Sequence, residues 1–361
     1  MSFQVDISVR TGAFQLEAQF ETDQGITVLF GRSGSGKTTL INAVAGLVLP
    51  TRGHIRVAGR TLFDSAVRQS LPPQNRRLGY IFQDARLFPH LSVARNLRYG
   101  MRFGARRGHQ GADFDQIVGM LGLNALLDRA PSSLSGGERQ RVAIGRALLA
   151  APEVILADEP LAALDTRRKM EIMPYFERIR DELQLPILYV SHSPAEVARL
   201  ASTVVVLDKG RVTQVGTPGD VLSDPAVAPM GVRNLGSVVH AQLVTHHADG
   251  LSELDAAGLR LFVPRVGAPI GATLRLRIAA HDIILANRAP EGLSALNVFP
   301  GTVHSVRTGE GPGALVTLMT DAGPIVARIT QRSASALGFS EGKQAFAIVK
   351  SVALAPEDIS G

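Results

Sequence analysis

The stretch ITVLFGRSGSGKTTLINAVAGL, residues 26–47, constrains the fold of this chain more than any other. An apolar run that suits a buried strand leads into a glycine-rich turn, and a helix-like segment follows the turn. Side chains would keep a ligand away from the backbone N–H groups of such a turn, so Gly31, Gly34 and Gly36 leave these groups accessible. The following helix aims its positive end at the same place. The stretch therefore predicts a strand, turn and helix that together bind an anion.

The turn matches G-x-x-x-x-G-K-[ST], the pattern of a nucleotide phosphate-binding loop. Lys37 would bring a positive charge to the β- and γ-phosphates, and Thr38 would offer a hydroxyl to Mg²⁺. A glycine turn without a ligand is the alternative, which the preceding strand and the following helix disfavour. We therefore predict ATP and Mg²⁺ as cofactors. The predicted nucleotide-binding residues of the loop are Gly31, Arg32, Ser33, Gly34, Ser35, Gly36, Lys37, Thr38 and Thr39.

Polar residues follow three further apolar runs that read as strands. Asp158 and Glu159 end VILADE, Gln83 ends LGYIFQ and His192 ends PILYVSH. Ligands of parallel α/β sheets bind at the carboxyl ends of strands. We expect Asp158, Gln83 and Thr38 to bind Mg²⁺. We expect Glu159, His192 and Gln83 to be catalytic residues. In this prediction Glu159 polarises water, His192 donates to the γ-phosphate and Gln83 senses the attacking water. Solvation or a structural role is the alternative for each residue taken alone.

The order of the apolar segments predicts the fold class. Buried strands alternate with helices, which indicates an α/β domain with a mixed sheet over residues 1–229 and a helical subdomain at about 84–150. VVVLDKGRVTQVG predicts a hairpin. A Pro- and Gly-rich passage follows, and the rest of the chain is β-like. Two similar segments there predict two small OB-like barrels, over residues 230–289 and 290–361. Coincidence between generic strands is the alternative.

Composition excludes several classes of protein. The 361 residues are 45% hydrophobic and 19% charged, which is typical of a folded globular chain. Without cysteine there are no disulfides and no thiolate chemistry. The net charge of +6 fits a solvated surface better than a nucleic-acid site. The start, MSFQVDISVR, lacks the apolar core of a signal peptide, and no window is long and apolar enough to cross a bilayer. We expect any membrane role to be peripheral.

LSGGERQRVAIGRALL, residues 134–149, predicts a helix that begins with a serine and two glycines. Ser135 can cap the first turn. Capping alone does not explain Gly136 and Gly137, which leave the positive end of the helix uncovered for an anion. Because the first loop already supplies one phosphate site, we expect this second site to serve a nucleotide held by another copy of the chain.

Taken in order, the Lys37 loop, Gln83, LSGGERQ, VILADEP, LAALD and His192 resemble the nucleotide-binding subunit of ATP-binding cassette (ABC) transporters over about residues 1–230. In that family two subunits pack head to tail around two ATP molecules. The resemblance implies that Ser135 and Gly137, with Gly136, contact the γ-phosphate in trans, that Asp165 couples the two sites and that Glu159 is the catalytic base. Phe14 is a candidate for the adenine-stacking aromatic, and a core strand position is the equal alternative.

Two further parts of the chain carry a resemblance to proteins that handle molybdate: one to the ATP-binding subunit of molybdate importers, the other to small molybdate-binding barrels. The first is YIFQDARLFPHLSVARNLRYGM, residues 80–101, which meets the permease in that group. Packing of Leu87, Phe88 and Pro89 within the helical subdomain is the alternative. In the tail, SALN and VKSV resemble the pair that holds molybdate in small barrels, and solvated loop ends are the alternative. The candidate oxyanion residues are Ser294, Asn297, Lys350 and Ser351.

The resemblance implies an ATPase that drives import of molybdate or tungstate from the cytoplasmic face of the bacterial inner membrane. Its partners would be a second copy of the chain, integral membrane permease subunits and, indirectly, a periplasmic substrate-binding protein, with molybdate possible at the tail. Importers of sulfate, iron, polyamines or sugars are the alternative. ABC proteins that act on nucleic acid are disfavoured, because the chain holds one phosphate-binding loop and one LSGG and lacks a long coiled coil between them.

Overall fold

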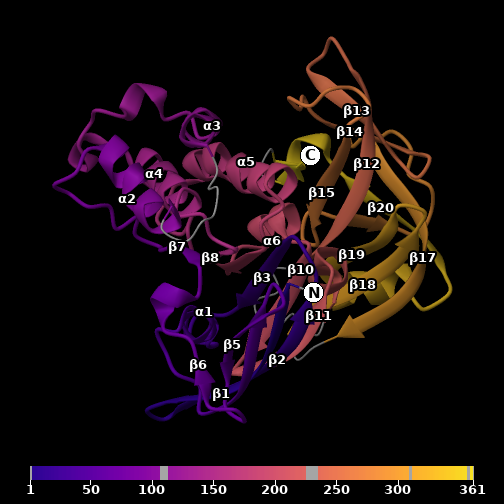
Figure 1. Cartoon of the computed structure of the whole chain (residues 1–361). Coiled ribbons are helices and arrows are strands. Elements are labelled where there is room, and N and C mark those ends of the chain that lie inside the picture. The colour runs from indigo at the N-terminus through magenta and orange to yellow at the C-terminus, as the bar shows by residue number, and fades with distance from the viewer. Residues whose placement is uncertain (1, 106–112, 225–234, 309–310, 356–357, 361) are drawn as a thin grey trace. The chain divides into compact units, whose positions relative to one another are not determined.

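The computed structural model describes residues 2–105, 113–224, 235–308, 311–355 and 358–360. The chain divides into two compact units: Met1–His192 with Leu200–Gly216, and Ser193–Arg199 with Thr217–Gly361 (Figure 1). The predicted boundary at residues 229 and 230 lies outside the described residues. The helices are α1 (Lys37–Ala45), α2 (Val93–Ala105), α3 (Phe114–Met120), α4 (Gly136–Leu148), α5 (Thr166–Glu182), α6 (Pro194–Leu200), α7 (Pro218–Ser223) and α8 (Gln331–Leu337).

The first unit is built on an 11-stranded mixed sheet with the order β6-β5-β4-β1-β2-β11-β10-β3-β9-β8-β7. The run from β10 to β7 is parallel, and the run from β6 to β2 is antiparallel. β10 and β11 form the predicted hairpin. The strands are β1 (Phe3–Thr11), β2 (Phe14–Thr22), β3 (Ile26–Gly31), β4 (Arg52–Val57), β5 (Arg60–Asp64), β6 (Gln69–Ser70), β7 (Leu78–Ile81), β8 (Val154–Asp158), β9 (Ile187–Ser191), β10 (Thr203–Asp208) and β11 (Arg211–Gly216).

The apolar runs of the sequence become the central parallel strands. Every residue of β3 and of β9 is buried, as expected where both faces of a sheet are covered. Helix α1 buries Leu40, Ile41 and Val44 in the core of this unit, alongside side chains from β3, β8 and β9. This packing fixes the start of α1, and with it the glycine-rich turn, beside the carboxyl ends of the parallel strands.

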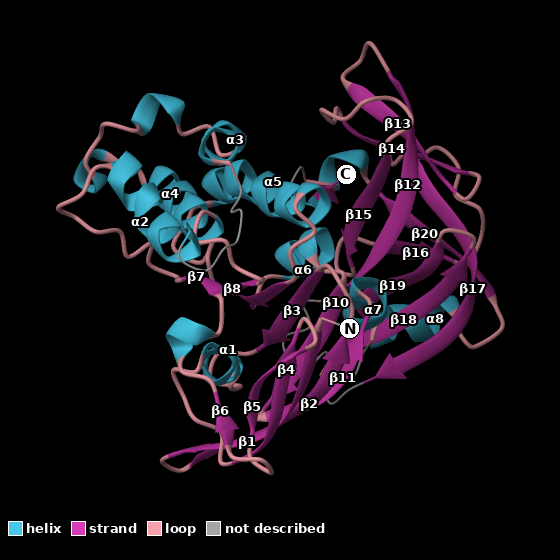
Figure 2. Ribbon diagram, in the orientation of Figure 1, coloured by secondary structure: helices cyan, strands magenta, loops and turns pink. Residues whose placement is uncertain are grey.

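Helices α2, α3 and α4 lie within the predicted helical subdomain and gather near β7 and β8 (Figure 2). Helix α4 contacts α2, α3, α5 and β7, so it connects this group to the sheet. Gly145 allows the close approach, because a Cβ at this position would lie 2.8 Å from Leu97 Cδ2 on α2. Among the helices that the structure describes, none is long and apolar enough to cross a membrane.

The second unit contains two five-stranded sheets with the orders β14-β13-β12-β15-β21 and β16-β20-β17-β18-β19. The two sheets have the same strand order when the second is read from β19. In the first sheet the long strand β12 lies between β13 and β15, and in the second the long strand β17 lies between β18 and β20. The strands are β12 (Gly236–His246), β13 (Leu251–Ala256), β14 (Leu259–Pro264), β15 (Thr273–Ala279), β16 (Ile284–Ala286), β17 (Asn297–Thr308), β18 (Gly313–Thr320), β19 (Gly323–Thr330), β20 (Gln344–Val349) and β21 (Ile359–Ser360).

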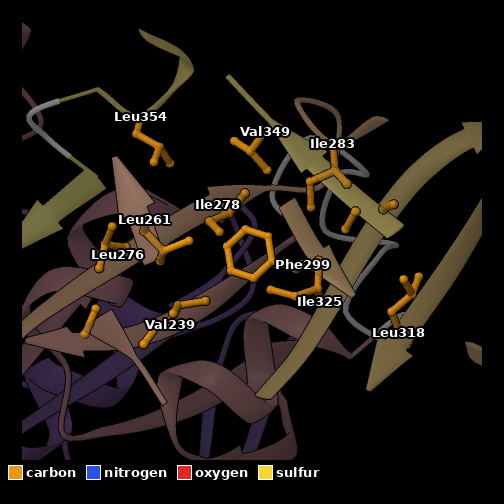
Figure 3. Close-up of a cluster of buried hydrophobic side chains, with 14 of the residues drawn as sticks. Val239, Leu261, Leu276, Ile278, Ile283, Phe299, Leu318, Ile325, Val349 and Leu354 are labelled. Carbon is orange, nitrogen blue, oxygen red and sulfur yellow. The ribbon is translucent and has the colours of Figure 1, made fainter. Parts of the chain in front are cut away.

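The two sheets exchange their fifth strands. β16 precedes residue 290 but pairs with β20, and β21 follows that residue but pairs with β15. Their inner faces share one apolar core, in which Phe299 lies among Ile278, Ile283 and Ile325 (Figure 3). The all-β tail expected from the sequence is therefore present. Its two halves are held together by strands as well as by side chains.

Candidate functional site

The glycine-rich turn joins β3 to α1 as the sequence predicts. Gly34 has a φ of 80° and Gly36, the N-cap residue of α1, a φ of 105°, both in the left-handed region that favours glycine. Gly31 is required for space instead, since a Cβ there would lie 2.4 Å from the Leu207 carbonyl oxygen. The turn therefore keeps its shape only with glycine at these positions.

Lys37 closes the turn upon itself. Its Nζ donates to the carbonyl oxygens of Gly31 and Arg32, at 2.8 Å each. The side chain is buried, and burial lowers the pKa of its ammonium, although the carboxylates of Glu159 and Asp158 act in the opposite direction. The lysine is thus held in the loop, with its charge where an anion would lie.

Thr38 and Asp158 meet beside this loop, at the end of β8. The Thr38 hydroxyl lies 3.3 Å from Asp158 Oδ1, and the Tyr80 hydroxyl lies 3.4 Å from Asp158 Oδ2 and 3.0 Å from Asn42 Oδ1. Burial is the main cause that raises the pKa of the Asp158 carboxyl. Hydroxyl and carboxylate oxygens are the ligands that Mg²⁺ prefers. Thr38 and Asp158 together therefore fit a magnesium ion.

Glu159 follows Asp158 and faces His192, which follows β9. His192 Nδ1 lies 3.3 Å from Glu159 Oε2. Glu159 has a φ of 45°, a conformation that is costly for a residue with a side chain and that recurs at functional sites. The strained backbone allows Asp158 to contact Thr38 while Glu159 faces the same cavity as Lys37.

A cavity of about 310 Å³ lies over the loop. Phe14 lines it, and the ring also packs against the core, so its position is compatible with both readings of this residue. Thr11 belongs to the wall and was not foreseen from the sequence; its pairing with Phe14 across the β1–β2 hairpin is the signal that would have found it. The cavity is lined by Thr11, Phe14, Ser33, Gly34, Gly36, Lys37, Thr38, Thr39 and Glu159.

Three residues of the predicted loop set, Gly31, Arg32 and Ser35, lie outside this lining. Arg32 is exposed and contributes its carbonyl to Lys37. Ser35 is buried, and its hydroxyl has no hydrogen-bond partner among the residues that the structure describes. The Ser35 carbonyl instead accepts from the Gly210 N–H at 3.0 Å, which fixes the loop to the β10–β11 hairpin.

The glycine-led helix α4 begins at Gly136 with a capping box. The Glu138 N–H donates to Ser135 Oγ at 3.2 Å, and the Ser135 N–H donates to Glu138 Oε2 at 2.7 Å. This second bond is the main cause that lowers the pKa of Glu138. Gly137 is buried, yet nothing lies within 4 Å of a Cβ placed there, so there is local space for a side chain at this position.

Gln83 and Gly136 line a second cavity, of about 400 Å³. Gln83 is exposed, and within one chain it faces this cavity and not the lining of the first. Asp165 caps α5, because its carboxylate accepts from the Arg168 N–H at 2.9 Å. The structure thus brings Lys37, Thr38, Asp158, Glu159 and His192 together, and leaves Gln83, Ser135, Gly136, Gly137 and Asp165 apart from them.

In the second unit, the four candidate oxyanion residues lie at the start of β17 and the end of β20. Asn297 pairs with Val349, which Lys350 and Ser351 follow. The Asn297 amide is engaged: its Oδ1 accepts from the Phe262 N–H at 2.6 Å and its Nδ2 donates to the Phe262 carbonyl at 2.9 Å. The Ser351 hydroxyl is buried without a partner in the described residues, whereas Ser294 and Lys350 are exposed.

Comparisons with known proteins agree with this geometry. Residues 16–162 match the family model of ABC transporters, and residues 293–356 match the TOBE domain. The chain is 49% identical to the molybdenum import ATP-binding protein ModC of Mesorhizobium japonicum, over 98% of this chain and 95% of the relative. It is 50% identical to ModC of Rhizobium meliloti, over 98% of this chain and 99% of the relative.

Among solved structures, the dimeric structure of MJ0796, a bacterial ABC transporter cassette, matches with a TM-score of 0.50 at 26% identity, over 60% of this chain and 99% of that chain. A post-hydrolysis state of that cassette, bound to ADP and Pi, matches equally well. On the identity and coverage of its relatives, together with the geometry of the phosphate-binding loop, the chain belongs to the ModC family of ABC transporter ATP-binding proteins.

Proposed function

We propose that this chain is the ATP-hydrolysing subunit of a bacterial importer of molybdate or tungstate. The observation that carries the ATPase part is that Lys37 and Glu159 line one cavity, with His192 3.3 Å from Glu159 and the Thr38–Asp158 pair beside it. The substrate follows from the relatives, which are named molybdenum import proteins and align with almost the whole chain. Sulfate, iron, polyamine and sugar importers are not favoured by these relatives.

The chemistry follows from the positions of the side chains. The amides of the turn and the Lys37 ammonium bind the phosphates. Thr38 and Asp158 would hold Mg²⁺, which neutralises phosphate charge when bound. Glu159 accepts a proton from the attacking water, and His192 orients Glu159 and donates to the γ-phosphate. The 3.3 Å separation of the last two residues allows both roles at one phosphate.

The second phosphate site supports a head-to-tail homodimer. Within one chain, the start of α4 and the phosphate-binding loop line different cavities, so a nucleotide at the loop would meet Ser135, Gly136 and Gly137 only from a second copy. Gln83 and Asp165 would then lie near the shared nucleotide. MJ0796, a similar cassette, has been solved as a dimer.

The proposed permease contact is the segment that follows Gln83. Residues 84–89 contribute exposed and half-buried side chains, including Leu87 and Pro89, to the second cavity. Phe88 packs within the helical subdomain instead, with its ring centroid 4.4 Å from that of Tyr99. The permease subunits would place the chain at the cytoplasmic face of the inner membrane, and a periplasmic binding protein would act through them.

For the tail we propose an oxyanion site formed by Ser294, Lys350 and Ser351, beside Asn297. The buried, unpartnered Ser351 hydroxyl and the adjacent exposed ammonium of Lys350 support it, since a tetrahedral dianion needs such donors. A purely structural tail is the alternative. Titration of molybdate into the full chain, with sulfate as competitor, decides between them.

The experiment that tests the function as a whole uses a strain without this gene. We expect its molybdenum content to fall at limiting molybdate and to be restored by the intact gene, but not by the Lys37→Ala variant. Sulfate uptake should be unchanged. A normal molybdenum content in the deletion strain would contradict the substrate, and the absence of Mg²⁺-dependent ATP hydrolysis by the purified chain would contradict the activity.

A further inference from the structure

A guanidinium from α4 holds the segment of residues 84–89. Arg146 Nη1 donates to the Arg86 carbonyl at 2.8 Å, and Nη2 donates to the Ala85 carbonyl at 3.1 Å. The carbon between these nitrogens lies 5.2 Å from the centroid of the Phe88 ring. One side chain of α4 thus contacts three residues of the segment.

These partners explain why the residue is an arginine. A planar guanidinium can donate to two carbonyl oxygens and stack on an aromatic ring at the same time. A lysine ammonium is a point charge with no flat face. Burial lowers the pKa of the Arg146 guanidinium, so placing the cation here is costly. The contacts of Arg146 with backbone carbonyls fix the path of the chain rather than pairing two charges.

The conformation of the segment requires such support. Arg86 has a φ of 43°, which is strained for a non-glycine residue. The Arg86 guanidinium lies 4.4 Å from the centroid of Phe82, and the Phe88 N–H donates to Oδ1 of the buried Asn96 at 2.8 Å. The segment is therefore held by Phe82, which follows β7, by α2 and by α4.

We propose that Arg146 is a positioning residue that makes residues 84–89 move with α4 as one body. Gly136 opens this helix and Arg146 lies in its last turn, so a displacement at a nucleotide is carried along the helix to the segment. Arg146 touches neither the phosphate-binding loop nor its cavity. The inference rests on the proposed function, because it gives the segment that we assign to the permease a mechanical link to the nucleotide.

The test is hydrogen exchange, followed by mass spectrometry, on the full chain in a Glu159→Gln background with and without Mg-ATP. Without nucleotide, we expect Arg146→Met to raise exchange of the Phe88 amide on the order of fivefold, because the segment loses one of its three supports. With nucleotide, exchange at the start of α4 should slow in both proteins. Slowing at residues 84–89 should occur in the parent and be lost in the variant.

Arg141→Met is the matched control. Arg141 lies on the same helix and also meets two carbonyls and a ring, those of Leu121, Gly122 and Tyr175, so its loss should leave exchange at residues 84–89 as in the parent. Arg146→Lys keeps the positive charge but loses the planar guanidinium, so it should change exchange in the same way as Arg146→Met. This second variant keeps the test valid if Arg146→Met misfolds.

An unchanged Phe88 amide in Arg146→Met without nucleotide would overturn the inference. So would nucleotide-dependent slowing at residues 84–89 that persists in Arg146→Met. If Mg-ATP fails to slow exchange at α4 in the parent, the proposed nucleotide sandwich is wrong, whereas the nucleotide-free comparison still decides whether Arg146 supports the segment.

Discussion

The imidazole of His192 and the carboxylate of Glu159 lie 3.3 Å apart, although 32 residues lie between them in the chain. Glu159 directly follows β8 and His192 directly follows β9, and these two strands pair in parallel. The carboxyl ends of neighbouring parallel strands meet at one edge, so the pairing of two buried apolar runs is what assembles the pair. The proposed hydrolytic site therefore depends on strand register as well as on the two side chains.

The Glu159→Gln variant removes the proposed proton acceptor and keeps the shape of the side chain. We expect ATP hydrolysis to fall by about 10²- to 10⁴-fold, while ATP affinity stays near that of the parent. Phosphate release and equilibrium nucleotide binding measure the two effects separately. Glu171→Gln, at an exposed position of α5, is the control and should hydrolyse ATP normally. Hydrolysis by Glu159→Gln at the parent rate would remove this residue from the mechanism.

Asp158→Asn is expected to stabilise the chain without nucleotide at pH 7. Burial raises the pKa of the folded Asp158 carboxyl above that of the unfolded chain, so its stabilising contribution is present below the unfolded pKa, about 4, and is lost as pH rises through the folded pKa. The amide avoids this loss. Denaturation midpoints of the two proteins should therefore differ at pH 7 and converge toward pH 4. A lower midpoint for the variant at pH 7 would contradict the reasoning.

Ser135 can be tested for its two roles with a pair of variants. Ser135→Ala should lower the stability of the chain by about 1 kcal/mol and Ser135→Gly by only a few tenths, since glycine is tolerated at an N-cap. If the hydroxyl also contacts phosphate in trans, both variants should weaken ATP-dependent dimerisation equally. Urea denaturation and light scattering give the two quantities. If Ser135→Ala weakens dimerisation more than Ser135→Gly does, as it does stability, the role of Ser135 is limited to capping the helix.

Asn297→Ala is expected to destabilise the second unit by about 2 kcal/mol, because the partly buried N–H and carbonyl of Phe262 lose their partners. Thermal unfolding measures the loss. Lys350→Ala, at an exposed position, should leave stability within about 0.5 kcal/mol and weaken molybdate binding. Equal molybdate affinity in the parent and in Lys350→Ala would argue for a structural tail.

The phosphate-binding loop could be predicted closely because strand, turn and helix are contiguous in the chain. Gly34 and Gly36 adopt the left-handed conformations that glycine permits, and Lys37 lies inside the loop. The strand-end residues Asp158 and Glu159 could be placed as well, since a parallel sheet brings such ends to one edge. These predictions needed only local patterns and one rule of topology.

Contacts between distant segments could not be predicted. Tyr80 reaches Asp158 because β7 and β8 pair in register, and no periodicity reports which strands are neighbours. The engaged amide of Asn297 has the same origin, since it bridges to Phe262 on a different sheet. β16 and β21 are too short to give a period, so the exchange of strands in the tail has no local signal.

That exchange has a consequence for how the tail unfolds. Each half contributes one edge strand to the sheet of the other half: β21 pairs with β15, and β16 pairs with β20. A cut near residue 290 would leave two open sheets, each with an unpaired rim prone to aggregation. Neither half therefore forms a complete sheet without the other, and we expect the tail to unfold as a single unit.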